Sequence, residues 1–136
     1  MNRVITLIAV LFVASCSGDV APLVATDVRL TAPMPGMTMS AGYLTLTNNT
    51  AETITISHVT SPEFGNVELH ETIIEDGIAR MAGLDHLDIA AGASAVLEPG
   101  GKHLMLMQPV GDLQEVTLDF HTDDAVALTV NVSIDN

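Results

Sequence analysis

From residue 25 onward the chain consists of short runs, of four to ten residues, in which apolar and polar side chains alternate. Ile54 and Ile56, for example, alternate with threonine and serine, as in a strand with one buried face. Turn-forming Gly, Pro, Asn and Asp residues separate the runs, and no segment carries a sustained apolar face at helical spacing. We therefore predict an all-β fold, a sandwich or Greek-key barrel of about eight to nine short strands. The runs expected to form strands are 25–30, 42–47, 52–60, 66–74, 78–82, 94–97, 102–107, 114–121 and 125–134.

The first fifteen residues have the organisation of an export signal. Arg3 precedes an apolar run, residues 4–14, that is too short to span a bilayer and matches the hydrophobic region of such signals. Small residues lead into Cys16, and this sequence resembles a bacterial lipobox, in which the cysteine becomes the lipidated first residue. The alternative is an ordinary signal peptide followed by a chance cysteine. We predict a signal peptide over 1–15, a lipidated N-terminus and tether over 16–26, and a β domain over 27–136. We also expect the protein to be a membrane-anchored lipoprotein at the periplasmic side of the bacterial cell envelope.

Composition and charge exclude several classes of function. The chain has 4 Lys+Arg against 17 Asp+Glu and a formal net charge of −13, which argues against nucleic-acid binding. Cys16 is the only cysteine, so its lipidation leaves no thiol to act as nucleophile, redox centre or thiolate ligand. Cysteine-ligated zinc and blue-copper sites are therefore not expected, and the chain's seven methionines become the unusual feature.

The run 102–107 reads KHLMLM. In a strand, Leu104 and Leu106 lie on one face and His103, Met105 and Met107 lie on the other. The two leucines suffice as a core face, so the opposite face would ordinarily carry Thr, Lys or Ser. It carries an imidazole and thioethers instead, and both groups are ligands for soft metal ions.

A second candidate pair of ligands flanks an expected hairpin. His70 ends a run in which Val67 and Leu69 are expected to face the core, so His70 points away from it. The turn residues Asp76-Gly77 then reverse the chain, which leads back through Met81. A two-residue loop would pair Thr72 with Met81 and leave His70 diagonal to Met81, whereas a four-residue loop would set His70 directly opposite Met81. Both registers leave room for one ion between the two side chains, and a three-residue loop would put them on opposite faces.

These four residues have the spacing H-x10-M-x21-H-x-M, which resembles the signature of the PCu(A)C family of periplasmic copper chaperones. The resemblance covers roughly residues 27–134, and it implies a cupredoxin-like β barrel that binds Cu(I) through His70, Met81, His103 and Met105. It also implies a role in supplying copper to cytochrome c oxidase. The supporting context is Gly42-Tyr43-Leu44, Asn48, His70-Glu71-Thr72 and the run 97–106, LEPGGKHLML.

The function expected from these features is that of a non-enzymatic Cu(I) chaperone. Thioethers are soft, neutral ligands that favour Cu(I) over zinc, magnesium or calcium. The expected partners are the copper ion, a receiving protein such as a cytochrome c oxidase subunit or another copper chaperone, and the membrane through Cys16. The alternatives are a lipoprotein for copper buffering or tolerance, a copper-dependent redox enzyme, and a structural lipoprotein whose methionines only pack.

Several other residues leave two interpretations open. Met34, Met37 and Met39 form either an accessory copper-capture patch or a loop that packs over one end of the barrel, and Met107 either supports the site or only packs. Glu68 and Glu71 flank His70 and are candidates to orient its ring. The remaining histidines are expected on the surface or at a strand end: His58, His86 and His121.

Overall fold

The structure is a computed structural model that describes residues 18–111 and 113–134. Within these residues the chain forms eleven strands and no helix, which confirms the predicted all-β fold. Accordingly, no helix in the described part is long and apolar enough to cross a membrane. The strands are β1 (Leu23–Leu30), β2 (Met39–Asn48), β3 (Ile54–Ile56), β4 (His58–Thr60), β5 (Phe64–Glu75), β6 (Ile78–Gly83), β7 (Leu87–Ile89), β8 (Ser94–Leu97), β9 (Lys102–Pro109), β10 (Glu115–His121) and β11 (Val126–Ser133).

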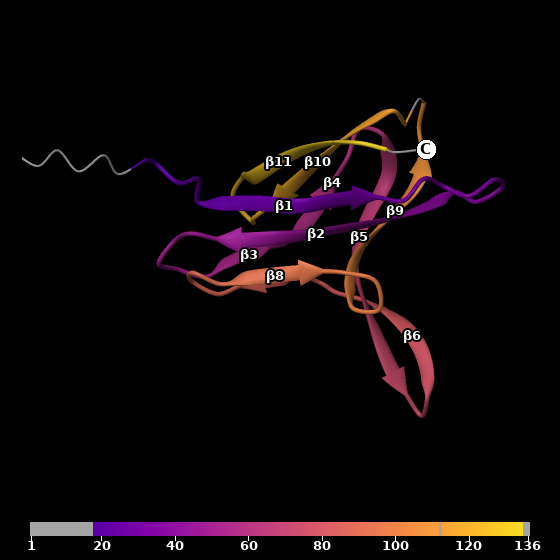
Figure 1. The fold of residues 1–136 in the computed structure, drawn as a ribbon, viewed down its shortest axis with the longest axis horizontal. Helices are drawn as coiled ribbons and strands as arrows, with labels where there is room; N and C mark the ends of the chain where they lie inside the picture. The colour runs from indigo at the N-terminus through magenta and orange to yellow at the C-terminus, as the bar shows by residue number, and fades with distance from the viewer. Residues whose placement is uncertain (1–17, 112, 135–136) are drawn as a thin grey trace, which may run out of the picture.

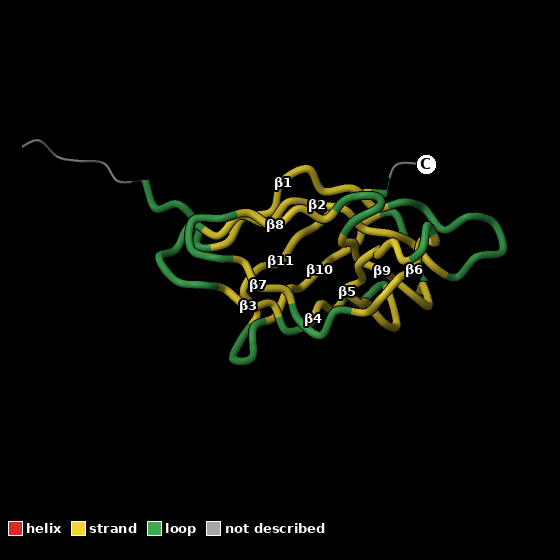
Figure 2. The backbone as a smooth tube through the Cα atoms, turned by 90° about the horizontal axis from the view of Figure 1, so that it is seen from below, coloured by secondary structure: helices red, strands yellow, loops and turns green. Residues whose placement is uncertain are grey.

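The strands form three antiparallel sheets around one interior. The largest has the order β1-β2-β9-β5-β6, with β8 also paired to β2; the others are β11-β10-β4 and β3-β7. Figure 2 shows β1, β2 and β8 along one side of the molecule and β3, β4 and β7 along the other. In Figure 1 the β5–β6 hairpin projects away from the rest of the fold.

Alternating residues of these strands build the core. Leu44 and Leu46 of β2 and Leu104 and Leu106 of β9 belong to one core cluster, and all four are almost completely buried. Gly42 lies where β2 approaches β9, and a Cβ there would come within 3.1 Å of the Leu104 Cβ. A side chain at this position would crowd Leu104, so the glycine favours the close approach of the two strands.

Asn48 is the buried polar residue that ties β2 to its surroundings. Its side chain is fully buried, and its Nδ2 donates hydrogen bonds to the carbonyls of Glu52 and Ile89 at 2.7 and 2.9 Å. Its Oδ1 accepts from the backbone N–H and the hydroxyl of Thr50, at 2.9 and 2.7 Å. Because both the amide and the carbonyl of this side chain are paired, the end of β2 is fixed to β7 and to the following turn.

Two details differ from the predicted strands. The run expected as one strand over 52–60 is divided at Ser57, where the chain passes from the β3-β7 sheet to the β11-β10-β4 sheet. The backbone N–H of Ser57 donates to the carbonyl of His121 at 2.8 Å. β7 was not predicted, because a run of three residues is too short to show a period. These two differences account for eleven strands where about nine were expected.

The N-terminal boundary also differs. β1 begins at Leu23, which pairs with Asn48, so the last part of the predicted tether is already strand. The predicted signal peptide, 1–15, and Cys16 lie outside the described residues.

Candidate metal centre

Three neighbouring strands, β9, β5 and β6, carry the four predicted ligands. Leu104 and Leu106 are buried in the core, so the alternation of β9 directs His103 and Met105 to the opposite face of the sheet. Leu69 of β5 is likewise buried, and the next residue, His70, therefore lies on the same outer face as His103. His70 is also where β5 leaves the core, because residues 70–75 are only half-buried or exposed.

The hairpin between β5 and β6 has the shorter of the two predicted even loops. Asp76 and Gly77 form its turn with φ of 51° and 77°, as a two-residue type I′ turn requires. Thr72 consequently pairs with Met81, and His70 pairs with Gly83. Met81 is thus on the face of His70, diagonal to it.

The two histidines face each other directly across the β5–β9 ladder. His70 pairs with His103, and their ring centroids are 5.9 Å apart with the ring planes inclined by 48°. The His103 residue is only 5% exposed and the His70 side chain 15%. The site therefore holds two shielded imidazoles on rigid strands.

Hydrogen bonds define which nitrogen of each ring is free. The Nδ1 of His103 lies 3.1 Å from the Gly101 carbonyl, and the Nε2 of His70 lies 2.7 Å from Oε2 of Glu68. Because a carbonyl or carboxylate oxygen can only accept, these two nitrogens carry the hydrogens in the neutral rings. The other nitrogens, Nε2 of His103 and Nδ1 of His70, are buried and have no hydrogen-bond partner among the described residues. Each ring therefore presents one unpaired lone pair, the state in which an imidazole binds a metal ion.

Glu68 is itself held in place. The Nδ2 of Asn66 donates to its Oε1 at 2.8 Å. The hydrogen bond from His70, and then the one from Asn66, lowers the pKa of the Glu68 carboxyl from its ordinary value. Glu71, the other acid considered beside His70, instead accepts from Nζ of Lys102 at 3.0 Å.

The two thioethers differ in accessibility. Met105 is half-buried beside His103, whereas Met81 is 62% exposed on the projecting hairpin. Both line one cavity of about 480 Å3, together with Met34, Met37 and Met39. Within the described residues no three His, Cys, Asp or Glu side chains are grouped to hold a metal ion, so a site at this face depends on the sulfur atoms.

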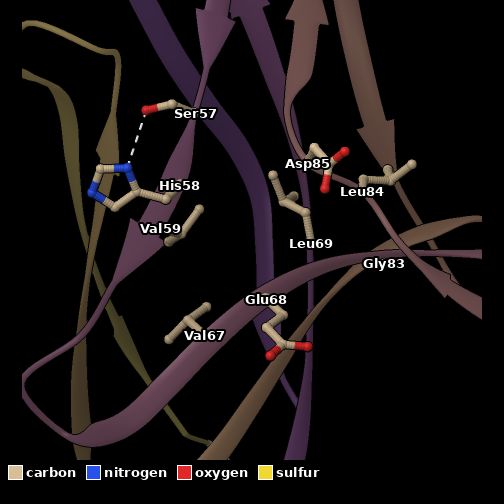
Figure 3. A pocket seen from close by; sticks show the side chains of 9 residues that line it. All are labelled: Ser57, His58, Val59, Val67, Glu68, Leu69, Gly83, Leu84 and Asp85. Atoms are coloured by element: carbon tan, nitrogen blue, oxygen red, sulfur yellow. Dashed lines mark hydrogen bonds between the residues drawn. The ribbon is translucent and has the colours of Figure 1, made fainter.

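The remaining candidates lie elsewhere or play other roles. His58 is exposed on β4 and stacks on His121 of β10, with ring centroids 4.3 Å apart. His58 and Glu68 both line a pocket of about 300 Å3 whose lining includes neither His70 nor His103. Figure 3 shows His58 there, hydrogen-bonded to Ser57. His86 is exposed, 3.6 Å from Asp88. Met107 pairs with Met39 across β2 and β9 and is not among the residues that line the methionine cavity.

Sequence reasoning did not single out the Gly101 carbonyl or the Asn66 amide. Each group lies two residues from its partner, Gly101 from His103 and Asn66 from Glu68, so the local course of the chain brings them into contact. For Gly101, the available signal was the glycine pair immediately before Lys102-His103.

Comparisons with solved structures define the class of the fold. The copper-bound PCuAC domain from PmoF2 superposes with a TM-score of 0.64 at 22% identity, over 84% of this chain and 92% of that one. The structure of apo-DR1885 from Deinococcus radiodurans gives 0.58 at 23% identity, over 98% and 91% of the two chains. The fold is thus that of PCuAC domains, cupredoxin-like β sandwiches, and the predicted resemblance to this class is confirmed.

Sequence comparison then gives the family. The chain belongs to the LpqE-like family, whose model, described as "Putative lipoprotein LpqE-like", matches residues 23–134. It is also 33% identical over 101 residues to "Uncharacterized protein RP573" of Rickettsia prowazekii (strain Madrid E), a match that covers 71% of this chain and 56% of that protein. The family description agrees with the predicted lipoprotein.

Proposed function

We propose that this protein is a copper chaperone that binds one Cu(I) ion through His70, Met81, His103 and Met105 and delivers it to a copper enzyme. The observation that carries the proposal is the pair of unpaired, buried ring nitrogens on His70 and His103, with ring centroids 5.9 Å apart. Leaving such groups unpaired costs free energy, and a shared metal ion is a partner that removes the cost for both.

The composition of the site favours Cu(I) over other metal ions. Two neutral imidazoles and two neutral thioethers form a soft set of ligands, and Mg²⁺ or Ca²⁺ would instead need several carboxylate oxygens. The carboxylate of Glu68, beside the His70 ring, is occupied by His70 and Asn66. Its role is to fix the orientation of the His70 ring.

The uneven burial of the ligands supports transfer of the ion to another protein. His103 is almost completely buried, whereas Met81 is 62% exposed at the edge strand of the sheet. A receiving protein can therefore replace the thioether of Met81 first, while the imidazoles still hold the ion. Met81 is a flexible, neutral ligand, which suits such an exchange.

The place of action and the receiver belong to the same proposal. The protein would be anchored by a lipid on Cys16 at the periplasmic side of the envelope and would serve cytochrome c oxidase assembly, either directly or through another copper chaperone. The formal charge of −13 supports this proposal, because its field attracts the cation and a basic patch on a receiver.

Anaerobic competition titration with a chromophoric Cu(I) chelator tests the proposed ligands. We expect His103→Ala and Met105→Ala each to lower the affinity for the tightly bound Cu(I) ion. Loss of a residue that only supports a ligand costs about 10–100-fold in affinity, and we expect a larger loss here. The matched controls, His86→Ala and Met107→Ala, remove the same groups elsewhere and should leave the affinity unchanged. Equal affinities of His103→Ala and His86→Ala would refute the site.

A further inference from the structure

We propose that Met34, Met37 and Met39 form a second, thioether-only Cu(I) site, which shares a cavity with the two methionines of the first site. The inference rests on the proposed function for the identity of the ion. It concerns a different set of ligands, on the loop between β1 and β2 and at the start of β2.

The loop is built to hold two of these methionines together. Met34-Pro35-Gly36-Met37 forms a turn in which the Met37 N–H donates to the Met34 carbonyl at 2.8 Å, and Gly36 has a φ of 83°. Proline followed by a left-handed glycine is the sequence of a type II turn, which brings its first and fourth residues close. Met34 and Met37 occupy those two positions.

Both ends of the loop are anchored. The Thr31 N–H donates to the Ala41 carbonyl at 2.9 Å, and the Ala41 N–H donates to the Thr31 hydroxyl at the same distance. The Gln108 N–H donates to the Thr38 carbonyl at 3.0 Å, which fixes the loop to the end of β9. Figure 1 shows this loop extending beyond β1 and β2 on the side where β9 ends.

The three side chains are exposed, which favours the capture patch over the other interpretation, a loop that packs over the end of the barrel. Met34, Met37 and Met39 are 64%, 47% and 44% exposed, and none belongs to the core cluster. Grouped exposed apolar side chains on a small domain call for a functional explanation. Packing does not supply one here.

The cavity itself indicates the ligand. Five of the chain's seven methionines line this single cavity of about 480 Å3: Met34, Met37, Met39, Met81 and Met105. The other lining residues are Thr31, Ala32, Ser40 and Ala41, so no charged or titratable side chain contributes. Such a lining offers nothing to a hard cation or an anion, whereas several flexible thioethers suit Cu(I).

Because the two sites border the same cavity, the second site can pass its ion to the first. Met81 and Met105, two ligands of the first site, also line the cavity. Met39 lies on β2, the strand next to that of Met105, and is diagonal to it, because Ala41 of β2 is the residue that pairs with Met105. An ion held by the loop methionines can reach the histidines by exchange of one thioether for another. The loop would thus capture the ion and pass it inward.

The test is anaerobic Cu(I) titration of the whole protein, with X-ray absorption to count the sulfur and nitrogen neighbours of the bound ion. We expect the wild type to bind two Cu(I) ions, and Met34→Leu/Met37→Leu/Met39→Leu to bind one, with nitrogen in its shell. We expect His70→Ala/His103→Ala to bind one ion with sulfur neighbours alone. Leucine conserves the volume of methionine, and Met107→Leu, which removes a thioether outside the cavity, should still bind two.

A triple leucine variant that binds as many Cu(I) ions as the wild type would overturn the inference and assign the cavity to another occupant. A wild type that binds a single ion would also overturn it. The outcomes separate the two proposals. If the histidine variant binds like the wild type while the leucine variant loses one ion, the loop site stands and the proposed histidine site fails.

Discussion

Oε2 of Glu68 lies 2.7 Å from Nε2 of His70, on the same strand and two residues away. This contact selects the ring tautomer in which Nδ1 of His70 is unprotonated, buried and without a partner among the described residues. The carboxylate of Glu68 therefore leaves Nδ1 of His70 free to bind a metal ion.

The first prediction concerns this contact. Glu68→Gln removes the charged acceptor that orients His70, and we expect Cu(I) affinity to fall by about 10–100-fold. Glu71→Gln is the matched control, because Glu71 accepts from Lys102 and not from a histidine. Competition titration measures both variants, and an equal loss in the two would show that Glu68 has no specific role.

The second prediction concerns pH. An imidazole cannot bind a metal ion when it is protonated, so Cu(I) binding should weaken clearly between pH 7.5 and pH 5. Glu68 does not contribute to this change. The hydrogen bonds from His70 and Asn66 lower the pKa of the Glu68 carboxyl in the folded protein. The contribution of Glu68 to the free energy of unfolding is therefore fully present above the pKa of the unfolded state and is lost as the pH falls through the lower pKa of the folded state. Equal affinities at pH 7.5 and 5 would contradict imidazole ligation.

The third prediction separates binding from stability at Met81. Met81 is 62% exposed, so Met81→Leu should change the free energy of unfolding of the metal-free protein by no more than about 0.5 kcal/mol. Its Cu(I) affinity should fall by roughly tenfold or more, which is about 1.4 kcal/mol of binding free energy. Chemical denaturation and competition titration on the same preparation measure the two quantities. An unchanged affinity would remove Met81 from the set of ligands.

The fourth prediction concerns the fold. Asn48→Ala leaves the Ile89 carbonyl and the Thr50 N–H without their partner, and we expect a loss of about 2–3 kcal/mol in the free energy of unfolding. Asn49→Ala is the control, because Asn49 is exposed and its side chain donates to the carbonyl of Ala21 at the surface. Urea denaturation measures both. Similar losses in the two variants would show that burial of the Asn48 network is not the cause.

Much of the fold and of the site could be predicted from the sequence, because alternation in a strand decides which face a side chain occupies. Leu104 and Leu106 were expected in the core with His103 and Met105 opposite, and the structure has that arrangement. The turn at Asp76-Gly77 also follows from local chemistry, since both residues tolerate positive φ. It selects the diagonal relation of His70 to Met81 from the two that the sequence left open.

What the sequence could not give depends on contacts between distant segments. The pairing of β5 with β9 sets His70 opposite His103, and no local pattern encodes that register. The ion pair of Glu71 with Lys102 depends on the same register, because these two residues lie opposite each other. The division of 52–60 at Ser57 likewise depends on β10, whose His121 carbonyl accepts from Ser57.

X-ray absorption on the protein loaded with one equivalent of Cu(I) decides whether two histidines and two methionines hold the ion together. The Met34→Leu/Met37→Leu/Met39→Leu background leaves only the site of His70, Met81, His103 and Met105. We expect two nitrogen and two sulfur neighbours around the ion. A shell of sulfur alone, or one of nitrogen and oxygen without sulfur, would contradict it.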